Sequence, residues 1–265
     1  MQFWKAEGLG NNFILMFKKE LPTNVTPTDL AKKLCKVKLS IGADGLVVLD
    51  NLSNPCHVTF YNQDGSKAEQ CGNALRVVTL LLDQLHTQKQ VSYELTTANG
   101  SFNAQIVKRS PYAATVKVAM GKPSITHLNH GIQLHNKQYF ITEVSMGNPH
   151  IILECHTPQE VPVNQLGPQL EHHPLFPNKT NVHFVNFENK KQAIMRTWER
   201  GVGETSACGS GACAVLVAGV LLKKLNPQAQ ISLPGGNLDI TWSQTAKQVF
   251  MTGPASLIFK GKYYI

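Results

Sequence analysis

The sequence predicts an α+β protein built from two similarly folded halves, and two observations support this. The first is an internal repeat: Cys71-Gly72 and Cys208-Gly209 lie 137 positions apart, each pair between a glycine-containing turn and an apolar run. The second is a series of short β-branched or aromatic runs bounded by turn residues, a pattern typical of strands. We therefore expect two pseudo-symmetric domains, each a mostly antiparallel sheet curled around one central buried helix.

A true duplication carries the same offset elsewhere in the chain. Gly10-Asn11 and Gly147-Asn148, Tyr61-Asn62 and Trp198-Glu199, and the strand-like segments 44–48 and 181–185 are each separated by 137 positions. These pairs predict one ungapped register, with a period far too long for a solenoid or propeller. We expect an N-terminal half at residues 1–120, completed by residues 254–265, and a C-terminal half at 121–253, with the turn-forming Gly121-Lys122-Pro123 as the linker.

The individual elements follow from local patterns. Thr26 is expected to cap a short helix over residues 30–35, and longer apolar helices are expected at 74–85 and 209–223. Apolar residues cover almost the whole circumference of the 74–85 helix, which predicts that it is buried on most sides. Strands are expected at 3–8, 13–17, 45–50, 58–62, 93–97, 101–108, 113–118, 137–144, 151–154, 182–186, 192–198, 231–233, 238–243 and 248–253.

Composition excludes several classes of protein. Hydrophobic residues at 42% and charged residues at 16% are typical of a folded globular chain. The residues that follow Met1 have no signal-peptide pattern and no apolar run approaches the ~20 residues of a membrane span, so we expect a cytoplasmic protein without a membrane partner. The net charge of +8 comes from scattered Lys and Arg, which indicates a solvated surface that favours a carboxylate substrate and not nucleic-acid binding.

The six cysteines have neither disulfide-framework nor zinc-site spacing, so we expect free thiols and no metal. Cys71 and Cys208 differ from the others because each precedes a predicted helix, whose N-terminal amides should lower the pKa of Cys208 and favour thiolate. The other four cysteines are expected to be apolar fillers.

Two equivalent thiols that face each other across a cleft can act on opposite faces of one carbon. One thiolate removes the α-proton and the opposed thiol delivers a proton to the other face, as a two-base epimerisation requires. Backbone amides at Gly72-Asn73 and Gly209-Ser210 would hold the α-carboxylate and the charge developing on it. The chain has no pyridoxal-lysine context or phosphate loop, so we expect no cofactor.

Ordered motifs across nearly the whole chain resemble the diaminopimelate epimerase family, and they occupy residues 8–11, 61–66, 70–73, 147–150, 180–182, 198–205 and 207–212. The resemblance implies a cofactor-independent isomerase that interconverts LL- and meso-diaminopimelate, a dicarboxylic diamino acid, and supplies lysine and peptidoglycan precursors. It also implies a homodimer.

The resemblance further assigns roles to individual residues. Cys71 and Cys208 are implied as base and acid, and His150 and Glu199 as groups that tune the thiols. The implied substrate-binding residues are Asn11, Asn62, Gly72, Asn73, Asn148, Asn181, Glu199, Arg200, Gly209 and Ser210, with Arg200 and three of the asparagines (62, 148 and 181) at the non-reacting carboxylate.

Two departures from the family pattern leave other functions open. The first motif usually reads Gly-Asn-Asp-Phe, whereas Asn12 replaces the aspartate here, and Ala74 stands where the family usually has glycine. The first alternative is therefore a racemase of another or broader amino-acid range, such as glutamate. Alternatives from a different class are a catalytically inactive binding protein of the same fold and a thiol-disulfide protein that uses Cys71 and Cys208. Taken singly, the asparagines are also ordinary turn residues.

Overall fold

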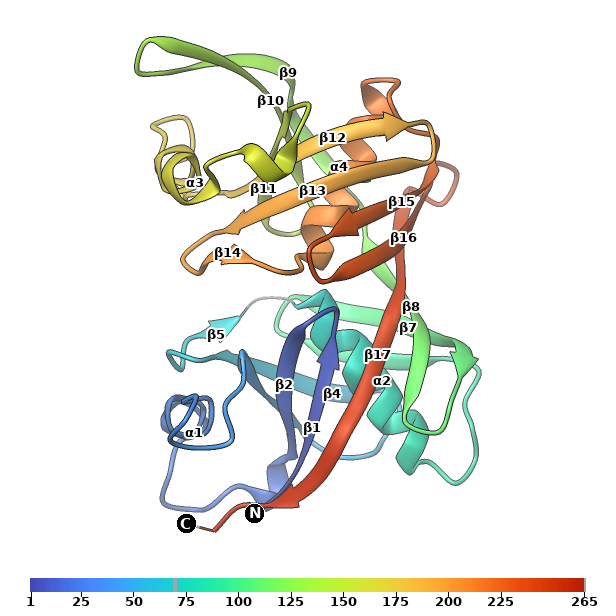
Figure 1. Ribbon diagram of the computed structural model, residues 1–265. Helices are drawn as coiled ribbons and strands as arrows, with labels where there is room; N and C mark the ends of the chain where they lie inside the picture. Colours follow the sequence, from blue (N-terminus) through green and yellow to red (C-terminus); the bar gives the residue numbers. More distant parts are fainter. Residues whose placement is uncertain (69–70, 265) are drawn as a thin grey trace. The chain divides into compact units, whose positions relative to one another are not determined.

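The computed structural model describes residues 1–68 and 71–264, so Gln70 of the predicted Cys71 motif and the C-terminal Ile265 lie outside the described residues. The chain divides into two compact units, Met1–Val118 with Gly253–Ile265, and Ala119–Thr252. Both units combine a strand-rich, mostly antiparallel sheet with few helices, which confirms the predicted α+β class (Figure 1).

The first unit holds the helices α1 (Pro27–Leu34) and α2 (Gly72–Leu85) and a 3-10 turn at Lys18–Glu20. Its strands pair antiparallel except for the parallel pairs β2–β3 and β4–β6. The chain end returns to this unit, where Gln2 pairs with Lys262 and the N-terminal ammonium donates to the carbonyl of Tyr263 at 3.0 Å. The strands are β1 (Gln2–Gly8), β2 (Asn11–Phe17), β3 (Gly45–Leu49), β4 (Cys56–Asn62), β5 (Lys67–Ala68), β6 (Tyr93–Thr97), β7 (Gly100–Arg109), β8 (Ala113–Gly121) and the end of β17 (Gln248–Lys262).

The second unit repeats this order. Its helices are α3 (Val163–Glu171) and α4 (Gly209–Leu221), with a 3-10 turn at Pro158–Glu160. Parallel pairing occurs between β11 and β12 and between β13 and β15, the counterparts of the two parallel pairs in the first unit. The strands are β9 (Ser124–Leu134), β10 (Lys137–Ser145), β11 (Pro149–Glu154), β12 (Asn181–Asn189), β13 (Gln192–Glu199), β14 (Gly203–Thr205), β15 (Gln228–Leu233), β16 (Gly236–Ser243) and the start of β17.

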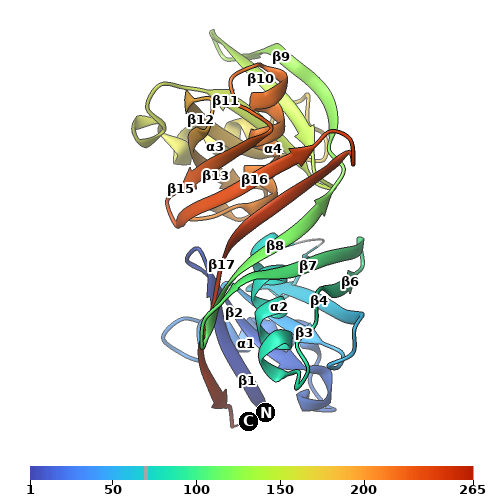
Figure 2. The ribbon, with the colours of Figure 1, turned by 90° about the vertical axis from the view of Figure 1, so that its right-hand side faces the viewer.

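One helix in each unit is buried in the sheet, as its apolar circumference predicts. In α2 every residue from Gly72 to Asp83 is buried, and the helix packs on β1, β2, β6 and β7. In α4 the apolar residues from Gly211 to Gly219 are buried against β10, β11, β12, β15 and β16 (Figure 2). A helix enclosed in this way holds its first turn rigidly. Cys71 and Cys208, which are related by the repeat offset of 137 positions, lie immediately before the first turns of α2 and α4.

The expected ungapped register is wrong in one segment. Phe13 pairs with Gly45, and its repeat partner His150 pairs with Asn181, so β3 and β12 are related by 136 positions and not by 137. The antiparallel pairing agrees, because Leu46 lies opposite Tyr61 while Val182 lies opposite Trp198. The two halves therefore differ by one residue in the connection that precedes these strands.

Two substantial elements were not predicted. Most side chains of strand β9 are exposed, so its sequence lacks the alternation of apolar and polar residues that predicts a strand. Antiparallel pairing with β10 holds β9 in place, and the end of β17 pairs with β1 in the same way. Helix α3 contains Gly167 and Pro168, which read as a loop, yet its bounds correspond to α1 at the repeat offset. Trp198 packs so closely on Gly167 that a β-carbon there would lie 2.5 Å from the ring. Among the described residues, no helix combines the length and apolarity that crossing a bilayer requires.

Candidate active site

Cys208 stands at the start of the buried helix α4. Its extended backbone, with φ of −123° and ψ of 102°, makes it the residue before the first turn, and its carbonyl accepts the first helical hydrogen bond from Ala212 at 2.9 Å. The N–H groups of a first helical turn have no acceptor within the helix, so those of Gly209 and Ser210 are suited to an anion. Gly211 must lack a side chain, because a β-carbon would lie 2.3 Å from Cε1 of His183 and 3.0 Å from Sγ of Cys208.

The expected lowering of the Cys208 pKa is wrong. Burial raises the pKa of this thiol well above its usual value, and the Glu199 carboxylate, which accepts a hydrogen bond from the thiol, raises it further. Hydrogen bonds from the Gly211 amide and the Ser210 hydroxyl oppose these effects without overcoming them. A helix N-terminus contributes only about half a charge, and desolvation outweighs it in a fully enclosed site. Cys208 is therefore a neutral thiol beside a carboxylate.

The Glu199 carboxylate is held in one orientation by the β13–β14 turn and by Thr205. Glu199 ends β13 and pairs with Gly203 across the β13–β14 turn, and the hydroxyl of Thr205 donates to its Oε1 at 2.6 Å. The Thr205 hydroxyl thus holds one oxygen of the Glu199 carboxylate, and this carboxylate lies next to Cys208. This arrangement gives the Cys208 proton a defined acceptor.

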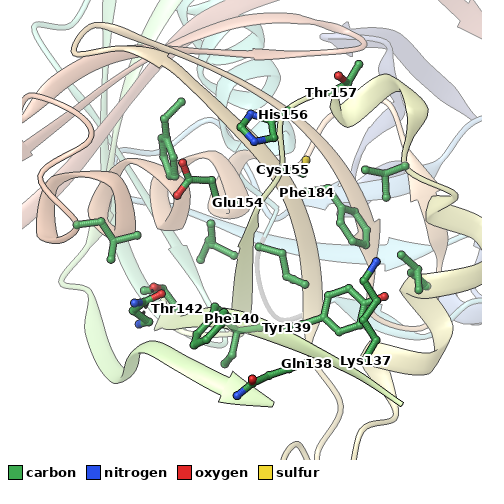
Figure 3. A pocket seen from close by; sticks show the side chains of 18 of the residues that line it. Lys137, Gln138, Tyr139, Phe140, Thr142, Glu154, Cys155, His156, Thr157 and Phe184 are labelled. Carbon is green, nitrogen blue, oxygen red and sulfur yellow. Dashed lines mark hydrogen bonds between the residues drawn. The ribbon is translucent and has the colours of Figure 1, made fainter. Parts of the chain in front are cut away.

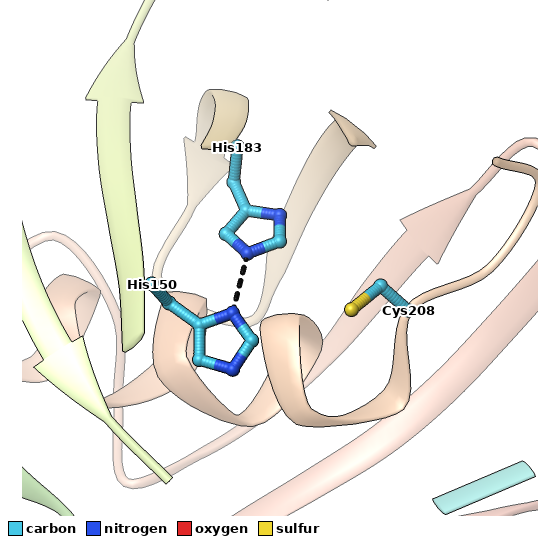
Figure 4. A group of neighbouring side chains, drawn as sticks. All are labelled: His150, His183 and Cys208. Carbon is cyan, nitrogen blue, oxygen red and sulfur yellow. Dashed lines mark hydrogen bonds between the residues drawn. The ribbon is translucent and has the colours of Figure 1, made fainter. Parts of the chain in front are cut away.

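His150 lies beside the same thiol and contacts a second buried imidazole, that of His183 (Figure 4). His150 Nδ1 lies 2.9 Å from His183 Nε2, and the outer nitrogens reach Asn148 Oδ1 and Thr197 Oγ1, each at 3.0 Å. Because the Asn148 oxygen only accepts, His150 Nε2 carries a proton, His183 Nε2 donates to His150, and the Thr197 hydroxyl donates to His183. The four groups form one hydrogen-bond chain with a single direction.

Both imidazoles are neutral in this chain. Burial lowers the pKa of His150 well below its usual value, and the neighbouring His183 imidazole and Arg200 guanidinium disfavour its protonation further. Burial alone lowers the pKa of His183 to about 3. His150 is therefore a donor toward Asn148 and not a cation.

Asn181 connects β12 to the arginine that follows β13. Its side-chain amide donates to the Pro149 carbonyl at 2.8 Å, and its oxygen accepts the backbone N–H of Arg200 at 3.0 Å. The structure thus gives Asn181 a role in positioning Arg200, whose half-exposed side chain also contacts the Asn178 carbonyl.

The first unit repeats the thiol arrangement around Cys71. The residue again precedes its helix with an extended backbone, and its Sγ lies 3.9 Å from Oδ1 of Asn11. The same oxygen accepts a hydrogen bond from the side chain of the buried Asn73 at 3.2 Å. Cys71, Asn11 and Asn73 therefore converge, whereas Asn62 is held in its own turn by a hydrogen bond to Ser66.

Asp44 determines how Asn11 is held and explains the unusual Asn12. One Asp44 oxygen accepts from the side chains of Asn11 and Asn12, at 3.1 and 2.8 Å, and from the Asn12 backbone at 2.7 Å. Asn12 Oδ1 in turn accepts from the buried Lys5 ammonium at 2.5 Å. The side chain of Asn12 thus helps to hold Asp44, which in turn holds Asn11. An aspartate at position 12 would place a second carboxylate beside Asp44, and the amide avoids this.

Sequence reasoning missed His183, Thr197 and Asp44. A signal for His183 existed, because side chains alternate along a strand and His183 is two residues after Asn181 in a predicted strand. Asp44 and Thr197 carried no comparable signal, since their partners are 32 or 14 residues away in the chain.

A pocket of about 810 Å³ in the second unit is separate from these residues (Figure 3). Lys137 to Phe140 of β10 lie on one side, and the segment from Glu154, the last residue of β11, to Thr157 lies on the other. None of the predicted site residues lines it. Its volume therefore does not identify the active site.

The fold is shared with solved structures that have low sequence identity to this chain. A solved structure titled as a probable proline racemase from Agrobacterium radiobacter K84 superposes with a TM-score of 0.77 over 100% of this chain and 93% of its own, at 15% identity. At that identity the likeness concerns the fold alone.

Sequence similarity defines the family. The family model for diaminopimelate epimerase matches residues 3–126 and 142–258. Diaminopimelate epimerases of Halothermothrix orenii and Carboxydothermus hydrogenoformans are 36% and 37% identical, over 100% of this chain and 98% and 100% of theirs. The chain belongs to the diaminopimelate epimerase family, whose members are isomerases, and this confirms the predicted family and enzyme class.

Proposed function

We propose that this chain interconverts LL- and meso-diaminopimelate by a two-base mechanism that uses Cys71 and Cys208. The observation that carries the proposal is the matched setting of the two thiols. Each thiol directly precedes the one sheet-enclosed helix of its unit, at the same repeat offset, and each has polar partners at its sulfur. Full-length similarity to curated diaminopimelate epimerases supports the choice of substrate.

In one direction a Cys71 thiolate removes the α-proton and Cys208 protonates the opposite face. The α-proton passes to the Cys71 sulfur, and the electron pair of the broken C–H bond stays on the carbon as the carbanion. The S–H bond of Cys208 breaks as the new C–H bond forms. The raised pKa of the Cys208 thiol suits this donor role. In the reverse direction Glu199, which already accepts the thiol hydrogen bond, takes that proton and leaves the Cys208 thiolate to remove the α-proton. The S–H bond of Cys71 then breaks as its proton passes to the opposite face of the carbanion.

The planar carbanion places charge on the α-carboxylate. We assign this carboxylate to the amides that begin the two helices, at Gly72-Asn73 and Gly209-Ser210, because a rigid helix terminus stabilises an anion without reorganising. The buried positions of both helices support the assignment. Exclusion of water by the same burial strengthens this stabilisation.

The non-reacting end of the substrate carries a second carboxylate, which we assign to Arg200 with Asn62 and Asn148. A guanidinium matches a planar carboxylate with two parallel hydrogen bonds. Asn181 contributes by holding the Arg200 backbone, and Asn11 and Glu199 are assigned to the ammonium groups. These assignments make the substrate a dicarboxylic diamino acid.

The wider expectations belong to the same proposal. We propose that residues 1–120 with 254–265, and 121–253, are the two epimerase halves, that the enzyme works in the cytoplasm as a homodimer, and that it needs no cofactor. It would supply lysine and peptidoglycan precursors. Size-exclusion chromatography with light scattering measures the oligomeric state directly.

Incubation with LL-diaminopimelate in heavy water tests the reaction. An epimerase forms the meso isomer with deuterium at the inverted carbon, and mass spectrometry with chiral separation detects both. A binding protein or a thiol-disulfide protein yields neither product. Parallel incubation with L-glutamate and other amino acids tests the broader racemase, which would incorporate deuterium into those substrates at a comparable rate.

A further inference from the structure

His150, His183 and Cys208 form a group of three metal-binding side chains in the interior of the second unit. Each is buried, and one ligand atom from each lies within 4.8 Å of the other two (Figure 4). The side chain of Cys208 points toward the two imidazoles. The group is assembled from β11, β12 and the start of α4, which is why cysteine spacing in the sequence gave no sign of it.

We propose that these three residues form an inhibitory site for a soft divalent cation, with Zn²⁺ as the best match. Two imidazole nitrogens and one thiolate are ligands that zinc prefers, and a tetrahedral ion would keep its fourth position for water. The proposal rests on the proposed function in one respect: a metal on Cys208 inhibits only if that sulfur moves the proton.

The surroundings of the two imidazoles fit metal binding. A ligating histidine generally donates its other ring N–H to an oxygen. His150 already donates through Nε2 to Asn148, and Thr197 Oγ1 lies 3.0 Å from the outer nitrogen of His183. Moving the His183 proton from Nε2 to Nδ1 would free Nε2 for the ion and make Thr197 the acceptor.

The sulfur supplies the charge of the site. Its proton passes to Glu199, which accepts the thiol hydrogen bond, and from there to solvent, so the metal replaces one proton. Zinc bonds of about 2.0–2.3 Å require ligand atoms somewhat over 3 Å apart. The 2.9 Å separation of the imidazole nitrogens is close to this value. The Cys208 sulfur lies within 4.8 Å of both ligand nitrogens.

Cobalt provides a readout that does not depend on activity. Co²⁺ is added anaerobically to the reduced full-length chain, and the sulfur-to-cobalt charge-transfer band in the near ultraviolet is titrated. We expect one ion per chain, loss of the band in Cys208→Ala, and retention in Cys155→Ser, which removes a half-buried thiol elsewhere in the unit. His183→Gln should weaken cobalt binding on the order of tenfold or more.

Zinc inhibition links the site to turnover. We expect Zn²⁺ to inhibit wild-type epimerisation, a chelator to restore it, and the inhibition constant to rise in His183→Gln in parallel with the cobalt affinity. If His183→Gln does not fold, Thr197→Val removes only the oxygen behind His183 and should weaken binding by roughly tenfold. A band that survives Cys208→Ala, or affinities unchanged in both His183→Gln and Thr197→Val, would overturn the site. An inactive wild-type chain with an intact cobalt band would instead refute the proposed function and leave the metal site standing.

Discussion

The backbone N–H of Arg200 donates to Oδ1 of Asn181 at 3.0 Å, so the arginine proposed to bind substrate is positioned by a residue on the neighbouring strand. The same Asn181 side chain holds the Pro149 carbonyl beside His150. One buried amide thus connects the arginine, the start of β11 and the histidine pair.

Replacing Asn181 by Ala should cost both stability and substrate affinity. The change leaves the Arg200 N–H and the Pro149 carbonyl without this partner, which costs about 1–3 kcal/mol for a buried group. We expect a lower free energy of unfolding by urea denaturation and a higher KM from the misplaced Arg200. Arg200→Lys is the comparison: it loses the planar fork and should raise KM with little change in stability. If Asn181→Ala raises KM without loss of stability, Asn181 acts on the substrate alone.

Cys71→Ala and Cys208→Ala should each abolish epimerisation, because removal of either sulfur leaves one face of the carbanion without a proton donor or acceptor. The remaining thiolate can still exchange the α-proton of the isomer that faces it. We therefore expect deuterium incorporation without inversion, with opposite isomer preferences in the two variants. Mass spectrometry and chiral analysis of each isomer measure this, with Cys155→Ser as the active control. Near-normal inversion in either alanine variant would exclude the two-thiol mechanism.

Gly211→Ala should destabilise the second unit, although alanine is normally favoured over glycine in a helix by about 1 kcal/mol. The added β-carbon would lie 2.3 Å from His183 Cε1, and overpacking of this kind costs about 1–3 kcal/mol. It should also displace Cys208 and reduce turnover. Ser210→Ala, in the same turn, adds no atom and serves as the stability control in urea unfolding. Equal or greater stability of Gly211→Ala would show that His183 can move away from α4.

Asp83, at the end of α2, should make the stability of the first unit depend on pH. Burial disfavours its charge, but hydrogen bonds from Arg109 and Tyr93 and the charges of Arg109 and Lys89 outweigh burial and lower its pKa. An acid with a lowered folded pKa contributes stability above its unfolded pKa of about 3.9 and loses it as pH falls through the folded value.

Arg109→Leu tests this contribution. The Arg109 side chain is 46% exposed, so solvent screening reduces the loss at pH 7 to about 1–2 kcal/mol, below the usual cost of breaking a buried pair. The difference from wild type should narrow below about pH 4 as Asp83 is protonated in both proteins. Urea unfolding at several pH values measures this difference. A constant difference across the range would show that Arg109 acts by packing and not by charge.

The sequence by itself determined the fold class, the internal repeat, most strands, the two buried helices and the two thiols. These features have local signals, because apolar periodicity, glycine turns and the repeat offset are properties of contiguous residues. The repeat also contained a signal for α3, since α1 predicts a helix at the corresponding position, but Gly167 and Pro168 suggested a loop. Packing of Trp198 on Gly167 and burial of Leu170 fix that helix.

Only the tertiary structure decided the chemistry around the thiols. His183 meets His150, and Asp44 meets Asn11, through strand pairings between residues more than 30 positions apart. The pKa of Cys208 shows the same limit: the helix terminus was visible in the sequence, but the depth of burial and the approach of Glu199 were not. Desolvation and charge–charge distances depend on which segments enclose a group, and they reversed the direction that the local motif predicted.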